Sequence, residues 1–274
     1  RSGVDIIRRL GPRRVKYTTA AEVRGFMRDV ASGKTKADQK TKKRGRSIVR
    51  GGIGTGTRTV GLLGAILTYA RESGIIDANP AHGIRKAADQ KRTRRLSEDE
   101  YRLLGKLLKT ASQDDQLATA AEMGKAIALT GCRRGEIINL IWPEVDSDNS
   151  CLRLTDSKEG ASVRPIGLPV VDLLNARRPE HAAGPVFGGT IEGKPLIGFP
   201  KHWHKMLEGT PLAGITPHVL RHSYASMAND LGFTESTVAA LLGHAQGTVT
   251  SRYIHTVDTA LIMAADAVAG YIQG

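Results

Sequence analysis

Apolar residues recur at helical spacing through most of this sequence, but in residues 151–168 the spacing becomes alternating. There the stretches CLRLT and VRPIGLP lie on either side of the polar turn SKEGAS, a pattern typical of a β-hairpin. Helical spacing returns after this region and continues to the end of the chain. We therefore predict a mainly α-helical protein that contains one small β-sheet.

Two helices are predicted in the first part of the chain. Thr18 and Thr19 are good N-cap residues, and apolar residues follow them at helical spacing up to Val30. The later stretch GGIGTGT lacks the Lys-Ser/Thr of a phosphate-binding loop, and no convincing strand precedes it. We interpret it as a flexible lead into a helix from about Thr57 to Glu72. This part of the chain is therefore predicted to be a small all-helical domain.

A capping box marks the start of a second domain. Ser97 is followed by Glu100, at the spacing at which each side chain can satisfy the backbone N–H of the other. We expect one domain at 1–86 and another at 97–274, joined by an exposed basic linker at 87–96. Further helices of the second domain are predicted near 116–129, 134–141, 169–177, 197–208, 217–230, 234–242, 246–254 and 258–272.

Positive charge is concentrated in the first part of the chain. Residues 1–96 hold 24 Lys and Arg against 7 Asp and Glu, a balance of +17, whereas the remainder holds 16 against 20, or −4. A basic part joined to a near-neutral part indicates a polyanionic partner. Nucleic acid is favoured over a membrane surface, because no amphipathic basic helix with an aromatic-rich face accompanies the charge. A solvated basic tail is the alternative.

Much of this charge lies in the segment GKTKADQKTKKRGRSIVRGG, residues 33–52, which carries eight Lys or Arg and one Asp. It is interpreted either as a solvated loop or as a loop that contacts the DNA backbone. The linker has a similar composition. The basic residues predicted to contact DNA phosphates are Lys40, Lys42, Lys43, Arg44, Arg46, Arg50, Lys91, Arg92, Arg94 and Arg95.

Composition disfavours several other classes of protein. No apolar run reaches ~18 residues, so a membrane span is not expected, and nothing at the start resembles a secretory signal. Cys132 and Cys151 form no CxxC motif, which argues against a disulfide scaffold or a Cys-rich zinc site and fits a reducing cytoplasm. The stretch DSDNS at 146–150 lacks the central Gly of a calcium loop and is interpreted as a turn.

The stretch TPHVLRHSYAS, residues 216–226, could bind an anion. Thr216 and Pro217 are typical of a helix start, where free N–H groups and the helix dipole favour negative charge. His218, Arg221 and His222 follow at i, i+3 and i+4 and share one face. The HxxxH spacing could suggest zinc, but the glutamate of HExxH is missing and no third ligand is identifiable. A metal site is therefore disfavoured, and a structural helix with two surface histidines is the plain alternative.

A second arginine site lies in TGCRRGEIINLIW, residues 130–142. Glu136 lies within one turn of the pair Arg133 and Arg134, and an arginine held by a carboxylate can present its fork to a phosphate. Alone this pattern is weak, because Arg-Glu pairs on helices are usually surface salt bridges. Arg134 is expected to be exposed, and for Glu136 a surface role is as plausible as a role in orienting Arg133.

The stretch LLGHAQGTVTSRYIH, residues 241–255, places Tyr253 nine positions after His244. Taken alone, this tyrosine is more simply interpreted as a buried core aromatic than as a nucleophile. Tyr224 is the other tyrosine close to these motifs, and its place inside a predicted helix favours core packing.

Taken in order, these pieces resemble the tyrosine recombinase (phage integrase) family over residues 97–274. The motif TG-x-R-x-GE, a hairpin lysine followed by RPIGLP, HxLRH, LLGH and a tyrosine nine residues after that histidine all occur in family order. The first domain resembles the family's helical core-binding domain more loosely. The resemblance implies a core-binding domain and an α+β catalytic domain that form a C-shaped clamp around double-stranded DNA.

The resemblance also implies roles for the residues that bind the scissile phosphate. Arg133 and Arg221 would hold its non-bridging oxygens, where charge grows in the pentavalent transition state. His244 would hydrogen-bond the phosphate. Glu136 and His222 match family positions with supporting roles.

Three further residues would move protons or form bonds. Tyr253 would be the nucleophile and give a 3′-phosphotyrosine, His218 would assist proton movement at the tyrosine, and Lys158 would protonate the leaving 5′ oxygen. Because side chains neutralise the phosphate, no metal or other cofactor is implied. Because the covalent step conserves the energy of the phosphodiester, no ATP is implied either.

We therefore expect a cytoplasmic, DNA-associated bacterial protein that acts as a site-specific recombinase, the integrase of a mobile element. Four protomers would act on two duplexes, with accessory DNA-bending or directionality proteins as further partners. Residue 1 is Arg, and we expect that an N-terminal arm-binding domain common among relatives was removed. The segment 258–272 could dock on a neighbouring subunit or pack on its own domain. The alternatives are a type IB topoisomerase-like relaxer, a non-catalytic DNA-binding factor and, least favoured, a metal-dependent nuclease.

Overall fold

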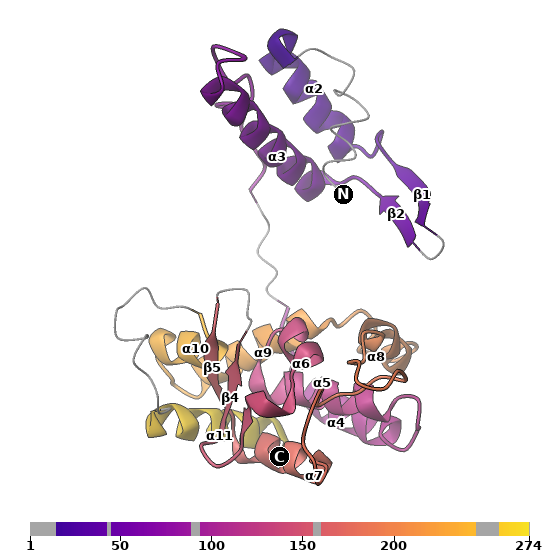
Figure 1. The fold of residues 1–274 in the computed structure, drawn as a ribbon, viewed down its shortest axis with the longest axis vertical. Helices are drawn as coiled ribbons and strands as arrows, with labels where there is room; N and C mark the ends of the chain where they lie inside the picture. Colours follow the sequence, from indigo (N-terminus) through magenta and orange to yellow (C-terminus); the bar gives the residue numbers. More distant parts are fainter. Residues whose placement is uncertain (1–14, 43–44, 89–93, 156–159, 245–257, 274) are drawn as a thin grey trace. The chain divides into compact units, whose positions relative to one another are not determined.

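The computed structural model describes residues 15–42, 45–88, 94–155, 160–244 and 258–273 of the 274-residue chain. The chain divides into two compact units, Arg1–Arg92 and Thr93–Gly274 (Figure 1). Each unit has its own buried core. Among the described residues, no helix combines the length and the apolarity that a membrane crossing requires.

The first unit is built on two helices that pack against each other. A short 3₁₀ turn, η1 (Val15–Tyr17), precedes α2 (Ala20–Ala31), and Thr19 closes the start of α2 in a capping box. The second helix is α3 (Ile53–Glu72). Their apolar faces form the core of the unit, which buries Val23, Phe26, Val30, Val60, Leu63, Leu67, Ala81 and Ile84.

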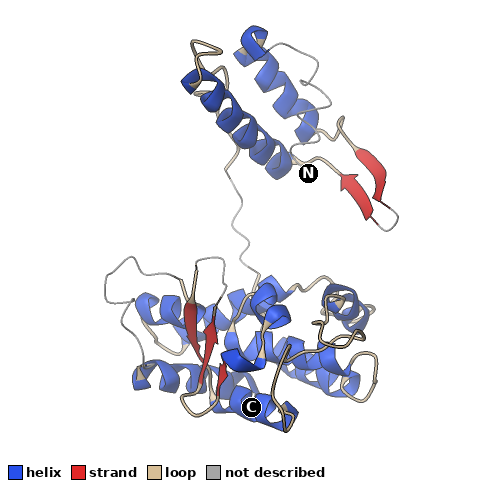
Figure 2. Ribbon diagram, viewed as in Figure 1, coloured by secondary structure: helices blue, strands red, loops and turns tan. Residues whose placement is uncertain are grey.

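The prediction of an all-helical first domain is wrong, because the basic segment between α2 and α3 forms a β-hairpin (Figure 2). Strand β1 (Ala37–Lys42) pairs antiparallel with β2 (Gly45–Val49). A two-stranded ribbon needs paired backbones but no buried face, so long charged side chains can extend from it into solvent. The abundance of Lys and Arg therefore concealed the strands. The end of β2 is anchored by Val49, which is buried.

Helix α3 begins earlier than predicted, at Ile53 rather than about Thr57, so the glycine-rich stretch is not a flexible lead. Gly52 is the N-cap, and Gly56 lies within the helix. A Cβ atom on Gly56 would lie 3.0 Å from the carbonyl oxygen of Met27 and 3.4 Å from Cβ of Ala31 in α2. The glycine therefore allows the two helices to approach closely, which helical spacing alone does not reveal.

The second unit opens with three helices, α4 (Glu98–Ala111), α5 (Ala118–Thr130) and α6 (Arg134–Asn139). The predicted capping box between Ser97 and Glu100 is present at the start of α4. Helix α5 is buried on nearly all sides and contacts α4, α7, α8, α9 and α11, which makes it the central helix of the unit. The remaining helices are α7 (Leu168–Arg177), α8 (Phe199–Leu207), α9 (Pro217–Asp230), α10 (Glu235–Leu242) and α11 (Thr259–Gln273).

A small antiparallel sheet lies among these helices (Figure 2). The predicted hairpin is confirmed as β4 (Cys151–Leu154) and β5 (Ser162–Pro165). A third strand, β3 (Val145–Asp146), pairs with the other side of β4 after the 3₁₀ turn η2 (Trp142–Glu144). Two residues are too few to produce an alternating pattern, so β3 was not predicted. The mainly α architecture with one small sheet in this unit is confirmed.

The helix predicted at 246–254 lies outside the described residues, whereas the last predicted helix is α11. This helix packs on its own unit and buries Ala264, Ala265, Val268 and Ala269. Asp266 accepts a hydrogen bond from the backbone N–H of Leu168 at 2.8 Å. The segment 258–272 could dock on a neighbouring subunit or pack on its own domain, and in this structure it packs on its own domain.

The end of the predicted linker belongs to the second unit. Leu96 is buried, and its backbone N–H donates to Oγ of Ser223 at 2.8 Å. The division between the two units lies between Arg92 and Thr93, before the boundary expected at Ser97.

Candidate active site

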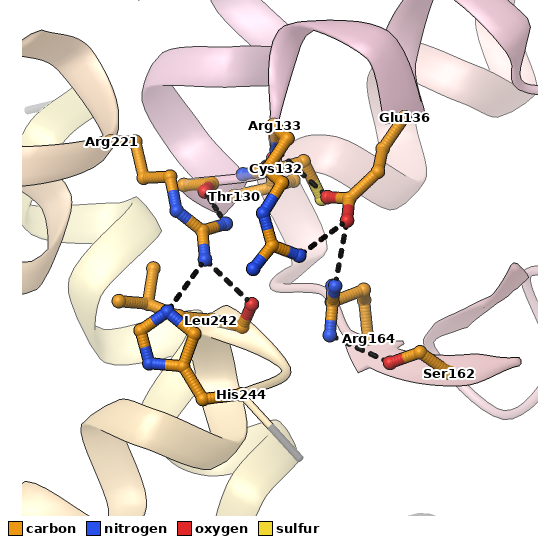
Figure 3. A network of polar contacts seen from close by, with 10 residues as sticks. Thr130, Cys132, Arg133, Glu136, Ser162, Arg164, Arg221, Leu242 and His244 are labelled. Carbon is orange, nitrogen blue, oxygen red and sulfur yellow. Dashed lines mark hydrogen bonds and ion pairs between the residues drawn. The ribbon is translucent and has the colours of Figure 1, made fainter. Parts of the chain in front are cut away.

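Arg133 stands at the N-cap of α6, directly after the turn that ends α5. Gly131 makes this turn with φ 63°, and a Cβ there would lie 2.7 Å from the ring of Tyr224 and 2.9 Å from Leu242. Glycine is therefore needed both for the left-handed backbone and for the close packing. The turn directs Arg133 into a cluster of polar side chains drawn from distant parts of the chain (Figure 3).

Glu136 holds Arg133 in this position. One carboxylate oxygen, Oε2, accepts from the backbone N–H of Arg133 at 2.8 Å, and the other, Oε1, accepts from its Nη1 at 3.0 Å. Burial by itself raises the pKa of the Glu136 carboxyl, but the charge and hydrogen bonds of Arg164 and Arg133 outweigh it and lower that pKa. The alternative of a surface role for Glu136 is wrong, because the residue is buried. Arg134 is exposed, as predicted.

Arg164 of β5 is a member of this cluster that the residue pattern did not single out. Its side chain is 1% exposed; Nη2 donates to Oε1 of Glu136 at 2.8 Å and Nη1 to Oγ of Ser162 at 2.7 Å (Figure 3). The available signal was its place in RPIGLP, directly after the hairpin turn. In an alternating strand of a basic protein, nothing marks a buried arginine as different from an exposed one.

Arg221 of α9 is buried and is held by main-chain acceptors. Nη1 donates to the carbonyl of Gly131 at 2.7 Å, and Nη2 donates to the carbonyl of Leu242 at 3.0 Å. Nη2 also lies 3.1 Å from Nε2 of His244. Burial and the charge of Arg133 lower the pKa of the guanidinium. Arginine stays protonated despite such shifts, so the side chain carries a fixed positive charge.

The guanidinium groups of Arg133 and Arg221 face the same space in Figure 3. With Arg164 the cluster holds three guanidinium groups against the one carboxylate of Glu136, which leaves two positive charges. Fixed guanidinium forks in a partly buried setting are suited to the oxygens of a phosphate. The arrangement is therefore suited to an anion, because its donors are already oriented.

His244 reaches this site from the end of α10. Gly243 is the C-cap of that helix with φ 61°, and a Cβ on it would lie only 0.7 Å from Nη1 of Arg164. The glycine of the LLGH motif therefore leaves room for the buried arginine. His244 is exposed, so its ring lies at the solvent side of the contact with Arg221.

His218 and His222 contact each other on the exposed side of α9. Their Nε2 atoms are 3.0 Å apart, so one ring donates and the other accepts. The rings meet edge to face. His218 lies one turn before Arg221 on α9, and His222 contacts His218 directly.

Lys158 and Tyr253 lie outside the described residues. The described flanks of Lys158 are β4 and β5, and those of Tyr253 are His244 and α11. Tyr224 is 1% exposed within an apolar cluster, and burial raises the pKa of its hydroxyl. Its interpretation as a core residue is confirmed.

Several basic side chains that were predicted to contact DNA are exposed. Three of them pair with carboxylates in this structure: Arg46 with Asp38, Arg94 with Glu100 and Arg95 with Asp230. Lys40 and Arg50 are also exposed. The remaining candidates, either whole or in their side chains, fall outside the described residues: Lys42, Lys43, Arg44, Lys91 and Arg92.

Within the described ranges, no three His, Cys, Asp or Glu side chains are placed to hold a metal ion. Cys132 and Cys151 are both buried free thiols.

The chain is similar to proteins of a known family. Residues 94–259 match the family described as the phage integrase family. Prophage integrase IntF of Escherichia coli K12 is 31% identical over 125 residues, which cover 44% of this chain and 27% of that protein. The tyrosine recombinase XerC of Stutzerimonas stutzeri is 26% identical over 194 residues, which cover 68% of this chain and 64% of that protein. The chain thus spans less than two thirds of the length of these relatives.

Two solved structures share the fold. A lambda integrase (residues 75–356) dimer bound to a COC′ core site has a TM-score of 0.66 at 19% identity and covers 92% of this chain and 85% of that chain. The Tn1549 transposon integrase (residues 82–397) with circular intermediate DNA has a TM-score of 0.63 at 16% identity and covers 96% and 89%.

Proposed function

Because this chain belongs to the phage integrase family, we propose that it is a site-specific DNA recombinase that cleaves and rejoins DNA through a 3′-phosphotyrosine intermediate. The observation that carries the proposal is the anion site formed by Arg133, Arg221 and His244. Its donors come from the start of α6, the middle of α9 and the end of α10. A surplus of fixed positive charge suits a phosphodiester that gains negative charge as it reacts.

In this proposal, the two arginines stabilise the transition state more than the ground state. When the phosphorus becomes pentavalent, charge grows on its non-bridging oxygens, and guanidinium donors already aimed at them need no reorganisation. Glu136 supports this role by holding Arg133, and two main-chain carbonyls support it by holding Arg221. His244 donates a further hydrogen bond to the same phosphate.

The covalent step uses Tyr253, Lys158 and His218. The tyrosine oxygen forms a bond to phosphorus as the bond between phosphorus and the 5′ oxygen breaks. The phenolic proton passes to His218, and the leaving 5′ oxygen takes a proton from Lys158. Rejoining is the reverse reaction with a 5′ hydroxyl as the nucleophile, so no cofactor enters the balance.

DNA binding is proposed for the basic side chains of the segment 33–52 and of the linker 87–96. Exposed ion pairs such as Arg46 with Asp38 contribute little stability, so a phosphate can replace the carboxylate. Both units would bind the same duplex, and protomers would assemble on DNA. Lambda integrase is described as a dimer on a core site and as a tetramer on a Holliday junction. For this chain, we propose a tetramer that acts on two duplexes.

The test uses radiolabelled duplexes from the ends of the element that encodes the protein, each nicked just beyond a candidate cleavage position so that the leaving fragment escapes. We expect an SDS-resistant protein–DNA adduct in the presence of EDTA with the natural chain and with Tyr224→Phe, but none with Tyr253→Phe. Tyr224→Phe is the matched control, because it removes a hydroxyl from the buried tyrosine. All three proteins should bind the duplex equally in a gel-shift assay.

An adduct that persists in Tyr253→Phe would refute the assignment of the nucleophile. Tight binding without any adduct would instead indicate a DNA-binding factor on the same fold. Exchange of strands between two labelled duplexes then separates a recombinase from a topoisomerase-like relaxer, which rejoins only the duplex that it cleaved.

A further inference from the structure

We propose that Arg164 is a positioning residue of the active site, which orients Arg133 by sharing the carboxylate of Glu136. The inference deepens the proposed function and rests on it. Arg164 lies on β5, and its guanidinium lies beside the α6 segment that carries Arg133 (Figure 3).

The burial of Arg164 requires an explanation. Its side chain is 1% exposed, and its Nε atom is buried without a hydrogen-bond partner among the described residues. A buried guanidinium is costly to desolvate, and an apolar side chain of similar volume often gives equal or greater stability at such a position. Stability of the sheet alone therefore does not account for an arginine here.

The shared oxygen of Glu136 provides the explanation. Oε1 accepts from Nη2 of Arg164 at 2.8 Å and from Nη1 of Arg133 at 3.0 Å. If Arg164 were absent, the carboxylate would have one guanidinium partner and would pair with it as a fork. That pairing would draw the Arg133 side chain toward α6 and away from the space that it shares with Arg221. Arg164 competes for the carboxylate and thereby sets where Arg133 points.

Arg164 also abuts the segment that carries the opposite side of the site. A Cβ on Gly243 would meet its Nη1 at 0.7 Å and its Cζ at 1.8 Å, so the guanidinium lies directly against this turn. The residues on either side of Gly243 are Leu242, whose carbonyl accepts from Arg221, and His244. One buried side chain therefore contacts both segments that position the phosphate-binding donors.

The test uses the full chain and compares Arg164→Met with the double variant Arg164→Met/Glu136→Gln. Methionine keeps an unbranched chain of similar length but removes the charge. Glutamine keeps the shape of Glu136 but can no longer form an ion pair with Arg133. The matched control is Arg153→Met, which removes an arginine from β4 of the same sheet where it pairs with Asp146 at 2.8 Å.

The first measurement uses inorganic phosphate as the probe and needs neither DNA nor covalent chemistry. We expect phosphate to raise the Tm of the natural chain and of Arg153→Met in a saturable manner, relative to sodium chloride at equal ionic strength. The rise in Tm should fall to less than about half in Arg164→Met, because the unpaired carboxylate of Glu136 competes with phosphate for Arg133. The rise should recover in the double variant, in which that carboxylate is removed. An undiminished rise in Arg164→Met, or no phosphate-specific rise in the natural chain, would overturn the inference.

The second measurement is the rate of adduct formation on the nicked duplexes at saturating protein. We expect Arg164→Met to lower this rate by about 10- to 100-fold, while DNA affinity changes by less than about twofold. The magnitude is that seen at metal sites when a residue that hydrogen-bonds a metal ligand is lost. The double variant should be faster than Arg164→Met, which a merely structural role for Arg164 would not produce. Equal rates in Arg164→Met and the double variant would refute positioning through Glu136. If the natural chain forms no adduct but the phosphate results hold, the recombinase function fails and the positioning role stands.

Discussion

Replacement of Gly243 by alanine should destabilise the second unit far more than its backbone conformation alone requires. A non-glycine residue at φ 61° costs about 1 kcal/mol. In addition, the new Cβ would occupy the position of Nη1 of Arg164, 0.7 Å away. Arg164 is 1% exposed, so its guanidinium cannot escape to solvent without giving up its bonds to Glu136 and Ser162. Disruption of a buried ion pair costs about 3–5 kcal/mol, which sets the size of the expected effect.

Gly232→Ala is the matched control. Gly232 has φ 86° in the same unit, and a Cβ there would meet nothing within 4 Å, so only the backbone cost of about 1 kcal/mol applies. Urea unfolding followed by tryptophan fluorescence gives the comparison. Both tryptophans, Trp142 and Trp203, are buried in the second unit, so the signal reports on that unit. Equal losses of unfolding free energy in the two variants would refute the steric role assigned to Gly243.

Three further results are expected. Arg221→Lys should slow adduct formation by about 10²- to 10³-fold, because an ammonium cannot reach two carbonyls and a phosphate as a planar fork does. The control Arg134→Lys, at an exposed position, should have no effect, and equal rates in the two variants would contradict the assignment of Arg221. The pKa of Glu136 is lowered in the folded state, so its contribution to stability is present above the unfolded-state pKa of about 4.3 and is lost as pH falls through the lower folded value. In urea unfolding between pH 3 and 7, Glu136→Gln should therefore lose less unfolding free energy on acidification than the natural chain. The logarithm of DNA affinity should fall with the logarithm of salt concentration by about 0.9 per phosphate neutralised, and an affinity that stays flat would contradict binding through the basic first unit.

Local signals in the sequence predicted most helices and the central hairpin. The capping box at Ser97, the helical spacing of α9 and the alternation in 151–168 each correspond to an observed element. These signals work because each reports an interaction between residues close in sequence, such as a cap, a helix face or a strand pair. They failed for β1 and β2, because most residues of the ribbon are polar or charged and only the end of β2 is apolar, so alternation carries little contrast.

For the candidate site too, some features could be predicted from the sequence and others could not. The resemblance of the ordered motifs to the phage integrase family singled out Arg133, Arg221 and His244, and the structure brings these three together. Motifs could not reveal that Glu136 is buried, because a glutamate three residues after an arginine has the same pattern on a surface helix.

Only the tertiary structure shows that Arg164 is buried against Glu136, that position 243 needs glycine and that Gly131 supports Arg221. Each depends on side chains and backbone atoms that lie far apart along the chain, 90 residues in the case of Arg221 and Gly131. Hydrophobic periodicity records whether a position faces a core, but it contains no information on which distant group meets a buried charge there. Such partners are set by the packing of α5, α9 and the sheet, and a single sequence does not encode that packing in any local pattern.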